Sequence, residues 1–199
     1  MRQQKTTFVN LVTFFTEKRL PLHSLKAFLM DIAYSQPVVE FVTVGAEYCA
    51  FLEQSQGRDK TALADTLLKL LPLLYVKAQL LPHVEGGASF GTETYVTEQD
   101  YNWLRAILAD VLGDEDEYED VVRGDAMETD DIRWMRISEG LADIYQPVRD
   151  FVECFRNGVA ENIEDALWAL NDSFELYWGG NLVDVLRRLH RLKYGTPQV

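Results

Sequence analysis

Apolar residues recur every three or four positions along most of the chain, which is the spacing of an amphipathic helix. No sustained alternation of apolar and polar residues, which would indicate a strand, is bounded by turn residues. The sequence therefore predicts an all-α fold, a single bundle of about seven helices with a long C-terminal helix. The predicted helices cover residues 6–18, 22–32, 37–57, 60–81, 97–113, 135–158 and 161–192.

Two of these predicted helices have distinctive patterns. Residues 60–81 are apolar on nearly every side, which is typical of a buried helix, although Pro72 is expected to kink or divide it. Leu71 and Leu74 should therefore lie in the core. In residues 161–192 the apolar spacing continues across two adjacent glycines, which predicts one helix, or two nearly collinear ones, of about 48 Å.

Charge is distributed unevenly along the chain. The sequence has 32 acidic and 19 basic residues, for a formal net charge of −13. Residues 110–131, the acidic segment, hold eleven acids against one base, Arg123. A chain this acidic repels phosphate backbones and is not attracted to an anionic membrane surface, which argues against a nucleic-acid or membrane partner.

The acidic segment is the first candidate binding site. Like charges packed this closely repel one another, and a cationic partner relieves the repulsion. We expect an exposed segment with a short helix around residues 115–122 that docks a basic protein. The alternative is a loop neutralised internally by Arg133, Arg136 and the basic residues near the C-terminus. The residues expected to contact a partner are Asp114, Glu115, Asp116, Glu117, Glu119 and Asp120.

The last predicted helix carries a second candidate, a polar pocket beneath aromatic residues. Asn171 falls inside its apolar arc, and a buried amide must find hydrogen-bond partners. Hydrogen bonding between helices is the simpler interpretation, and a ligand pocket is the other. The candidate pocket residues are Trp168, Asn171, Glu175 and Trp178.

Carboxylate pairs at near-helical spacing leave a metal-dependent (Mg²⁺ or Mn²⁺) phosphohydrolase as the alternative function. Glu161 with Glu164, and Asp172 with Glu175, resemble pairs that hold Mg²⁺ in some all-helical enzymes. Glu164 and Glu175 lie about 16 Å apart along one helix, so a facing helix would have to complete the site. The histidines show no metal-binding spacing, and we assign no cofactor, metal ligand or catalytic residue.

The remaining features concern location and domains. Two isolated cysteines, no signal cleavage site and no bilayer-spanning apolar run predict a cytoplasmic protein. No linker interrupts residues 30–199, which we interpret as a single domain, with residues 1–29 as a helical N-terminal extension. Neither the partner's identity nor the oligomeric state follows from the sequence.

Three stretches are distinctive when taken together. They are residues 38–44 with 47–53, residues 70–75 through 80–82, and residues 173–175 with 178–179 and 182–184. Jointly they resemble an uncharacterised bacterial family, domain of unknown function 5063, over roughly residues 31–192. The resemblance implies a bacterial, helical, cytoplasmic protein and supplies no activity and no catalytic residues.

Overall fold

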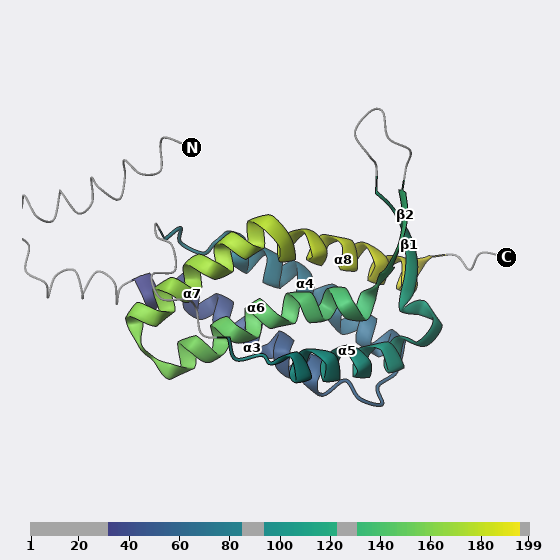
Figure 1. Cartoon of the computed structure of the whole chain (residues 1–199), viewed down its shortest axis with the longest axis horizontal. Helices are drawn as coiled ribbons and strands as arrows, with labels where there is room; N and C mark the ends of the chain where they lie inside the picture. Colours follow the sequence, from purple (N-terminus) through teal and green to yellow (C-terminus); the bar gives the residue numbers. More distant parts are fainter. Residues whose placement is uncertain (1–31, 85–93, 123–130, 196–199) are drawn as a thin grey trace, which may run out of the picture.

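The computed structural model describes residues 32–84, 94–122 and 131–195. The helix predicted over 6–18, and all but the last residue of the one predicted over 22–32, lie outside the described residues. The described part is an elongated bundle of helices from which one short hairpin projects (Figure 1).

The first two described helices, α3 (Gln36–Glu53) and α4 (Lys60–Gln79), pack against each other. The carboxylate of Asp59 accepts hydrogen bonds from the backbone N–H groups of Thr61 and Ala62, so it caps the start of α4. α4 continues through Pro72 instead of being divided there. A proline removes one helical hydrogen bond, and the leucines that α4 buries on both sides of it hold the helix together.

Helix α5 (Glu98–Leu112) begins at a capping box formed by Thr97 and Asp100. Each of these side chains accepts a hydrogen bond from the other residue's backbone N–H. The helix ends at Gly113, whose φ of 57° favours glycine. The chain then leaves the bundle toward the projecting hairpin (Figure 1).

The expectation of a helix around residues 115–122 is wrong. This stretch forms β1 (Glu117–Val122), which pairs antiparallel with β2 (Asp131–Arg136) and places Glu117 opposite Arg136. Acids three and four positions apart would repel one another on a helix. In the hairpin a glutamate faces a cation instead, and the aromatic and β-branched residues of both strands suit extended backbone.

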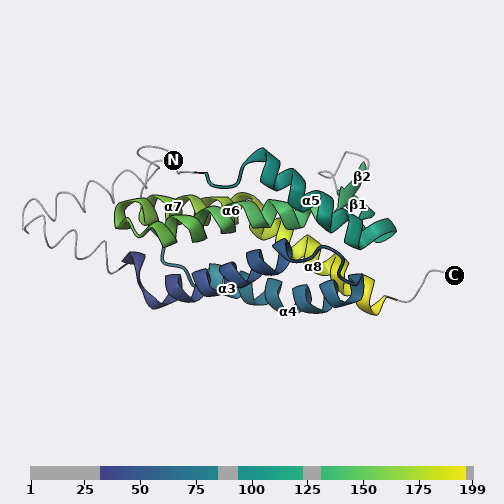
Figure 2. The ribbon, with the colours of Figure 1, turned by 90° about the horizontal axis from the view of Figure 1, so that it is seen from below.

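Helix α6 (Ile137–Asn157) is the central element of the bundle. It packs against α3, α5, α7 and α8. Figure 2 shows α3 and α4 on one side and α5, α6 and α7 on the other, with α8 running between them. α6 ends at Gly158, whose left-handed backbone (φ 73°) closes the helix.

The long C-terminal helix is confirmed as one continuous helical rod in three parts. α7 (Ala160–Ser173), the π-helical turn η2 (Phe174–Trp178) and α8 (Gly179–Tyr194) follow one another without a break. With the rod counted once, the described residues form five helices and a hairpin, so the expected count of about seven is not matched.

The core follows the predicted helical faces. Leu71 and Leu74 of α4 are both fully buried, as expected. Phe41 of α3, Phe151 of α6 and Trp178 of η2 are the large side chains at the centre, and Phe41 lies against both of the others. The fold is therefore a helical bundle organised around α6.

Candidate functional site

The six acids expected to contact a partner have different environments. They run from the turn η1 (Gly113–Glu115) into β1, at the base of the projecting hairpin and along it (Figure 1). Asp116 is buried, and the side chain of Asp120 lies outside the described part of the structure. The exposed members are Asp114, Glu115, Glu117 and Glu119.

Asp116 is a structural residue, which corrects the expectation that it is exposed. Its side chain is 5% exposed and accepts hydrogen bonds from the backbone N–H and the hydroxyl of Ser138, both at 2.7 Å. Its carbonyl accepts a further bond from the N–H of Ile137 at 2.9 Å. The first N–H groups of a helix have no partner inside the helix. Asp116 therefore caps α6 and places a negative charge at the positive end of its dipole.

Other contacts tie the hairpin to the bundle. Glu117 accepts a hydrogen bond from Arg136 at 2.5 Å, across the two strands. Arg188 of α8 donates to the carbonyl of Glu119 and lies over the Tyr118 ring at 4.0 Å. Part of the acidic segment is thus held by basic residues of this chain, as the alternative interpretation expects.

The hairpin has a second face, opposite the one that contacts α8 through Tyr118, and this outer face points away from α8. Side chains alternate between the two faces of a strand. Because Tyr118 faces Arg188, Glu117 and Glu119 face the other way. Trp134 lies directly opposite Glu119 in the register and is 68% exposed. This outer face therefore combines carboxylates with a large exposed aromatic ring.

The four candidate pocket residues lie on α7 and η2, and none of them lines the groove described below. Trp178 is buried and donates its indole N–H to the carbonyl of Leu170 at 3.2 Å. Asn171 donates to the carbonyl of Pro82 at 3.0 Å, so its amide links two segments of the chain. Glu175 is exposed and Trp168 is half-buried.

A groove with a volume of about 340 Å³ lies instead between α6 and the α7–η2 rod. Small side chains of α7, among them Ala166 and Ala169, leave the space, and Pro147 and Phe151 of α6 face it. None of the lining residues is basic. The polar lining residues are Asp143, Gln146, Asp150, Ser173 and Tyr177.

Four elements of the bundle converge on Asp143 at this groove. Its carboxylate accepts hydrogen bonds from the hydroxyls of Tyr101 in α5 and Tyr177 in η2, each at 2.7 Å, and from the Asn181 amide in α8 at 3.2 Å. Burial and the bond to Asp143 raise the pKa of both tyrosines, so both hydroxyls remain donors.

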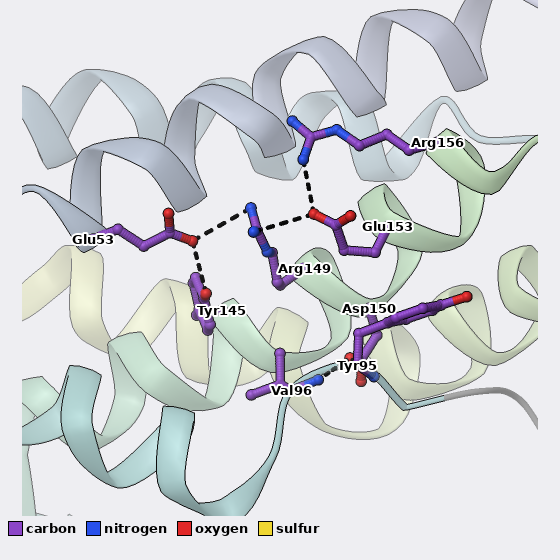
Figure 3. Close-up of polar contacts among 8 residues, drawn as sticks. All are labelled: Glu53, Tyr95, Val96, Tyr145, Arg149, Asp150, Glu153 and Arg156. Atoms are coloured by element: carbon purple, nitrogen blue, oxygen red, sulfur yellow. Dashed lines mark hydrogen bonds and ion pairs between the residues drawn. The ribbon is translucent and has the colours of Figure 1, made fainter.

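Asp150 lies two helical turns further along α6, and Figure 3 shows it beside Tyr95 and Val96. One of its oxygens accepts hydrogen bonds from the backbone N–H groups of Tyr95 and Val96, at 2.7 and 2.8 Å. Burial raises the pKa of this carboxyl in spite of those two bonds. The sequence pattern did not single out Asp143 or Asp150. The one sequence feature that could have indicated them is their spacing of seven residues around Pro147, which places both on the same side of a helix.

Figure 3 also shows an ion network between α3 and α6. Glu53 accepts a hydrogen bond from the Tyr145 hydroxyl at 2.8 Å and pairs with Arg149 at 3.3 Å. Glu153 pairs with Arg149 at 3.1 Å and with Arg156 at 2.7 Å. Two carboxylates face two guanidinium groups, so the network is balanced within the molecule and serves to join the two helices.

Two further findings bear on the alternative functions. No three His, Cys, Asp or Glu side chains in the described ranges are grouped so that they could hold a metal ion. Glu161, which belongs to one of the carboxylate pairs, lies in α7, but its side chain is not among those the structure describes. Within the same ranges no helix has the length and apolar character needed to cross a bilayer.

Comparison with known proteins identifies the family. A family model described as "Domain of unknown function (DUF5063)" matches residues 32–195. The chain belongs to this family. The resemblance inferred from the sequence is thereby confirmed, and the match includes both the hairpin and the groove.

A solved structure resembles most of this chain. The crystal structure of protein BF1032 from Bacteroides fragilis has 42% sequence identity and a TM-score of 0.72, and the similarity covers 82% of this chain and 99% of that one. No curated protein matches the chain. The function is therefore argued from the geometry of the site.

Proposed function

We propose that this protein is a non-enzymatic interaction protein, cytoplasmic in location, that docks a basic segment of a partner on the outer face of the β1–β2 hairpin. The observation that carries the proposal is Trp134, which is 68% exposed and lies opposite Glu119 on a hairpin that leaves the bundle. Large aromatic residues are enriched among those that dominate binding energy at protein interfaces.

The chemistry of this face favours a cationic partner. An arginine or lysine can stack on the indole ring of Trp134 while a neighbouring carboxylate pairs with its charge. Glu119 is exposed and its carboxylate makes no ion pair within the described part of the chain. Glu117 lies on the same face but already pairs with Arg136. The binding surface is therefore narrower than the six acids expected from the sequence.

Asp114 and Glu115 contribute differently. Both are exposed at the base of the hairpin, and Glu115 lies 3.7 Å from Lys60, an exposed contact of little energetic weight. Their charges add to the negative field around the hairpin, which speeds the encounter with a basic partner. We expect salt to weaken this contribution.

Fluorescence anisotropy with a labelled arginine-rich peptide tests the proposal. Trp134→Ala should weaken binding about tenfold, which corresponds to about 1.4 kcal/mol. Glu119→Gln should weaken it less, and more at low salt than at high salt. A peptide with glutamates in place of the arginines should not bind.

Two control variants make the result specific to the hairpin. Trp103 on α5 is 49% exposed, and Glu47 is an exposed acid on α3. Trp103→Ala and Glu47→Gln remove the same groups elsewhere on the surface and should leave binding unchanged. Equal losses for Trp134→Ala and Trp103→Ala would mean that the peptide binds the acidic surface in general, and the proposal would be wrong.

A further inference from the structure

The groove between α6 and the α7–η2 rod offers hydrogen-bond acceptors and few donors. The Ser173 hydroxyl donates to the carbonyl of Leu170 at 3.1 Å, and the Tyr177 hydroxyl donates to Asp143. With both protons used, Gln146 is the one lining side chain that still has donor protons available for a ligand.

Pro147 adds to the excess of hydrogen-bond acceptors over donors around the groove. It lies inside α6 and lines the groove. A proline has no N–H, so it removes the hydrogen bond that the carbonyl of Asp143 would accept in a regular helix. The carbonyl of Asp143 thus lacks its helical donor, and both Asp143 and Pro147 line the groove.

The charge of the groove is negative at two separate points. Asp143 and Asp150 are seven residues apart on one helix, so they lie on the same side of α6 at about 10 Å along its axis. The second carboxylate oxygen of Asp150 makes no hydrogen bond within the described chain, so it is available to a cationic group. Ala166, Ala169 and Phe151 supply apolar lining.

The backbone of η2 holds one of these two points in place. π-Helical turns are uncommon and occur often at functional sites. Here the turn carries Tyr177, whose hydroxyl contacts Asp143, and it is made possible by Gly179. The Asp143 carboxylate is thus held by Tyr101, Tyr177 and Asn181 before any ligand arrives.

We propose that this groove binds an aliphatic diamine, with one ammonium group at Asp143, the other at Asp150, and the methylene chain along the alanines of α7. An ammonium group has three donors and no acceptor, which complements a lining rich in acceptors. A dicarboxylate would be repelled by both aspartates, and a monoamine would leave one of them without a cation. This site is separate from the hairpin and does not depend on the docking proposal.

Isothermal titration calorimetry on the full chain tests the proposal, with putrescine, cadaverine and hexamethylenediamine as probes. At least one diamine should bind at a single site about tenfold more tightly than hexylamine, and adipate should not bind. Equal affinity for hexylamine and the diamines would overturn the two-ended site, as would the absence of binding by all three diamines.

Matched variants locate the binding. Asp143→Asn and Asp150→Asn should each weaken diamine binding about tenfold. Asp172→Asn removes the same charge from an exposed position on α7 outside the groove and should have no effect. If all three variants weaken binding equally, the amines bind to the negative surface in general and the proposal is wrong.

A second variant guards against misfolding of the aspartate variants. Ala169→Phe leaves both carboxylates in place and fills the groove with a benzyl group. It should abolish diamine binding while the far-UV circular dichroism spectrum stays native. Diamine binding that survives Ala169→Phe in a folded protein would place the site elsewhere.

Discussion

At the scale of single residues, neighbours on one helix have very different environments. Leu74 of α4 is fully buried, whereas Leu73 beside it is 44% exposed. Helical geometry turns successive side chains by about 100°, so only one of the two can face the core. The effect of removing each side chain should differ accordingly.

We expect Leu74→Ala to lower the free energy of unfolding by about 2–5 kcal/mol, because it leaves a cavity in the core. Leu73→Ala should change it by about 0.5 kcal/mol or less. Urea denaturation of both variants measures the difference. An unchanged denaturation midpoint for Leu74→Ala would show that packing of α4 into the core does not stabilise the fold.

Asp116 allows a prediction about a helix cap. Asp116→Ala leaves the buried N–H of Ser138 without its acceptor, which should lower the free energy of unfolding by about 1–3 kcal/mol. Asp116→Asn keeps an acceptor oxygen for that N–H and should lower the free energy of unfolding by less. Asp114→Ala, an exposed neighbour, serves as the control in thermal melts. Equal melting temperatures for Asp116→Ala and Asp114→Ala would contradict the capping role.

Asp150 makes stability depend on pH in a definite direction. Burial raises the pKa of this carboxyl in the folded state, so the folded protein holds the proton more tightly than the unfolded chain does. The stabilising contribution is fully present below the unfolded pKa and is lost as the pH rises through the folded pKa. Asp150→Asn should therefore melt with a weaker pH dependence over that acidic window than the parent. Superimposable melting temperature profiles would refute this assignment.

At the scale of elements, the sequence predicts the helices and misses the hairpin. The helical spacing of apolar residues survives in α3, α4, α6 and the C-terminal rod because each buries one continuous face. The strands were missed because β1 is rich in acidic residues, which are not typical of a strand. Its extended backbone is favoured by pairing with β2, where Arg136 lies opposite Glu117. Such a pairing joins residues 19 positions apart in the sequence, so a local pattern of apolar and polar residues does not predict it.

The groove was missed for a similar reason. The residues that line the groove come from two helices and a π-helical turn. The spacing of apolar residues in the sequence does not predict such a turn. The aromatic residues of α7 and η2 indicated a pocket, and Trp168 and Trp178 were the aromatic residues chosen as its lining. Of the aromatic residues on this rod, the one that lines the groove is Tyr177. The sequence thus indicated the correct helix but could not indicate which of its faces is open.

The π-helical turn yields a prediction on two adjacent glycines. A Cβ at position 179 would lie 2.6 Å from the carbonyl oxygen of Phe174, while one at position 180 would meet nothing within 4 Å. Gly179→Ala should lower the free energy of unfolding by about 1–3 kcal/mol through this clash. Gly180→Ala should raise it by up to about 1 kcal/mol, since alanine favours helix. Urea denaturation of both variants measures these changes. If Gly179→Ala leaves the free energy of unfolding unchanged, the π-helical turn adjusts to the added methyl group and the predicted clash is wrong.

At the scale of the whole molecule, the two proposed sites lie on different parts of one bundle. The hairpin projects near one end of the bundle (Figure 1). The groove lies between α6 and the α7–η2 rod. Variants separated by more than about 10 Å usually act independently. Trp134→Ala should therefore leave diamine binding unchanged, and Asp150→Asn should leave peptide binding unchanged, so failure of one proposal leaves the other testable.

The extent of the folding unit is the last prediction. The buried residues of the described chain run from Ala33 to Leu189, and the family model matches residues 32–195. We therefore expect a chain that begins at Met30 to fold with a cooperative thermal transition, because it keeps every one of those buried side chains. A chain that begins at Thr43 lacks Val38 and Phe41, both fully buried, and should lose that transition. Circular dichroism melts of the two truncated chains beside the full one provide the measurement. If the chain beginning at Met30 is insoluble or melts without cooperativity, residues 1–29 belong to the folding unit and the division into extension and domain is wrong.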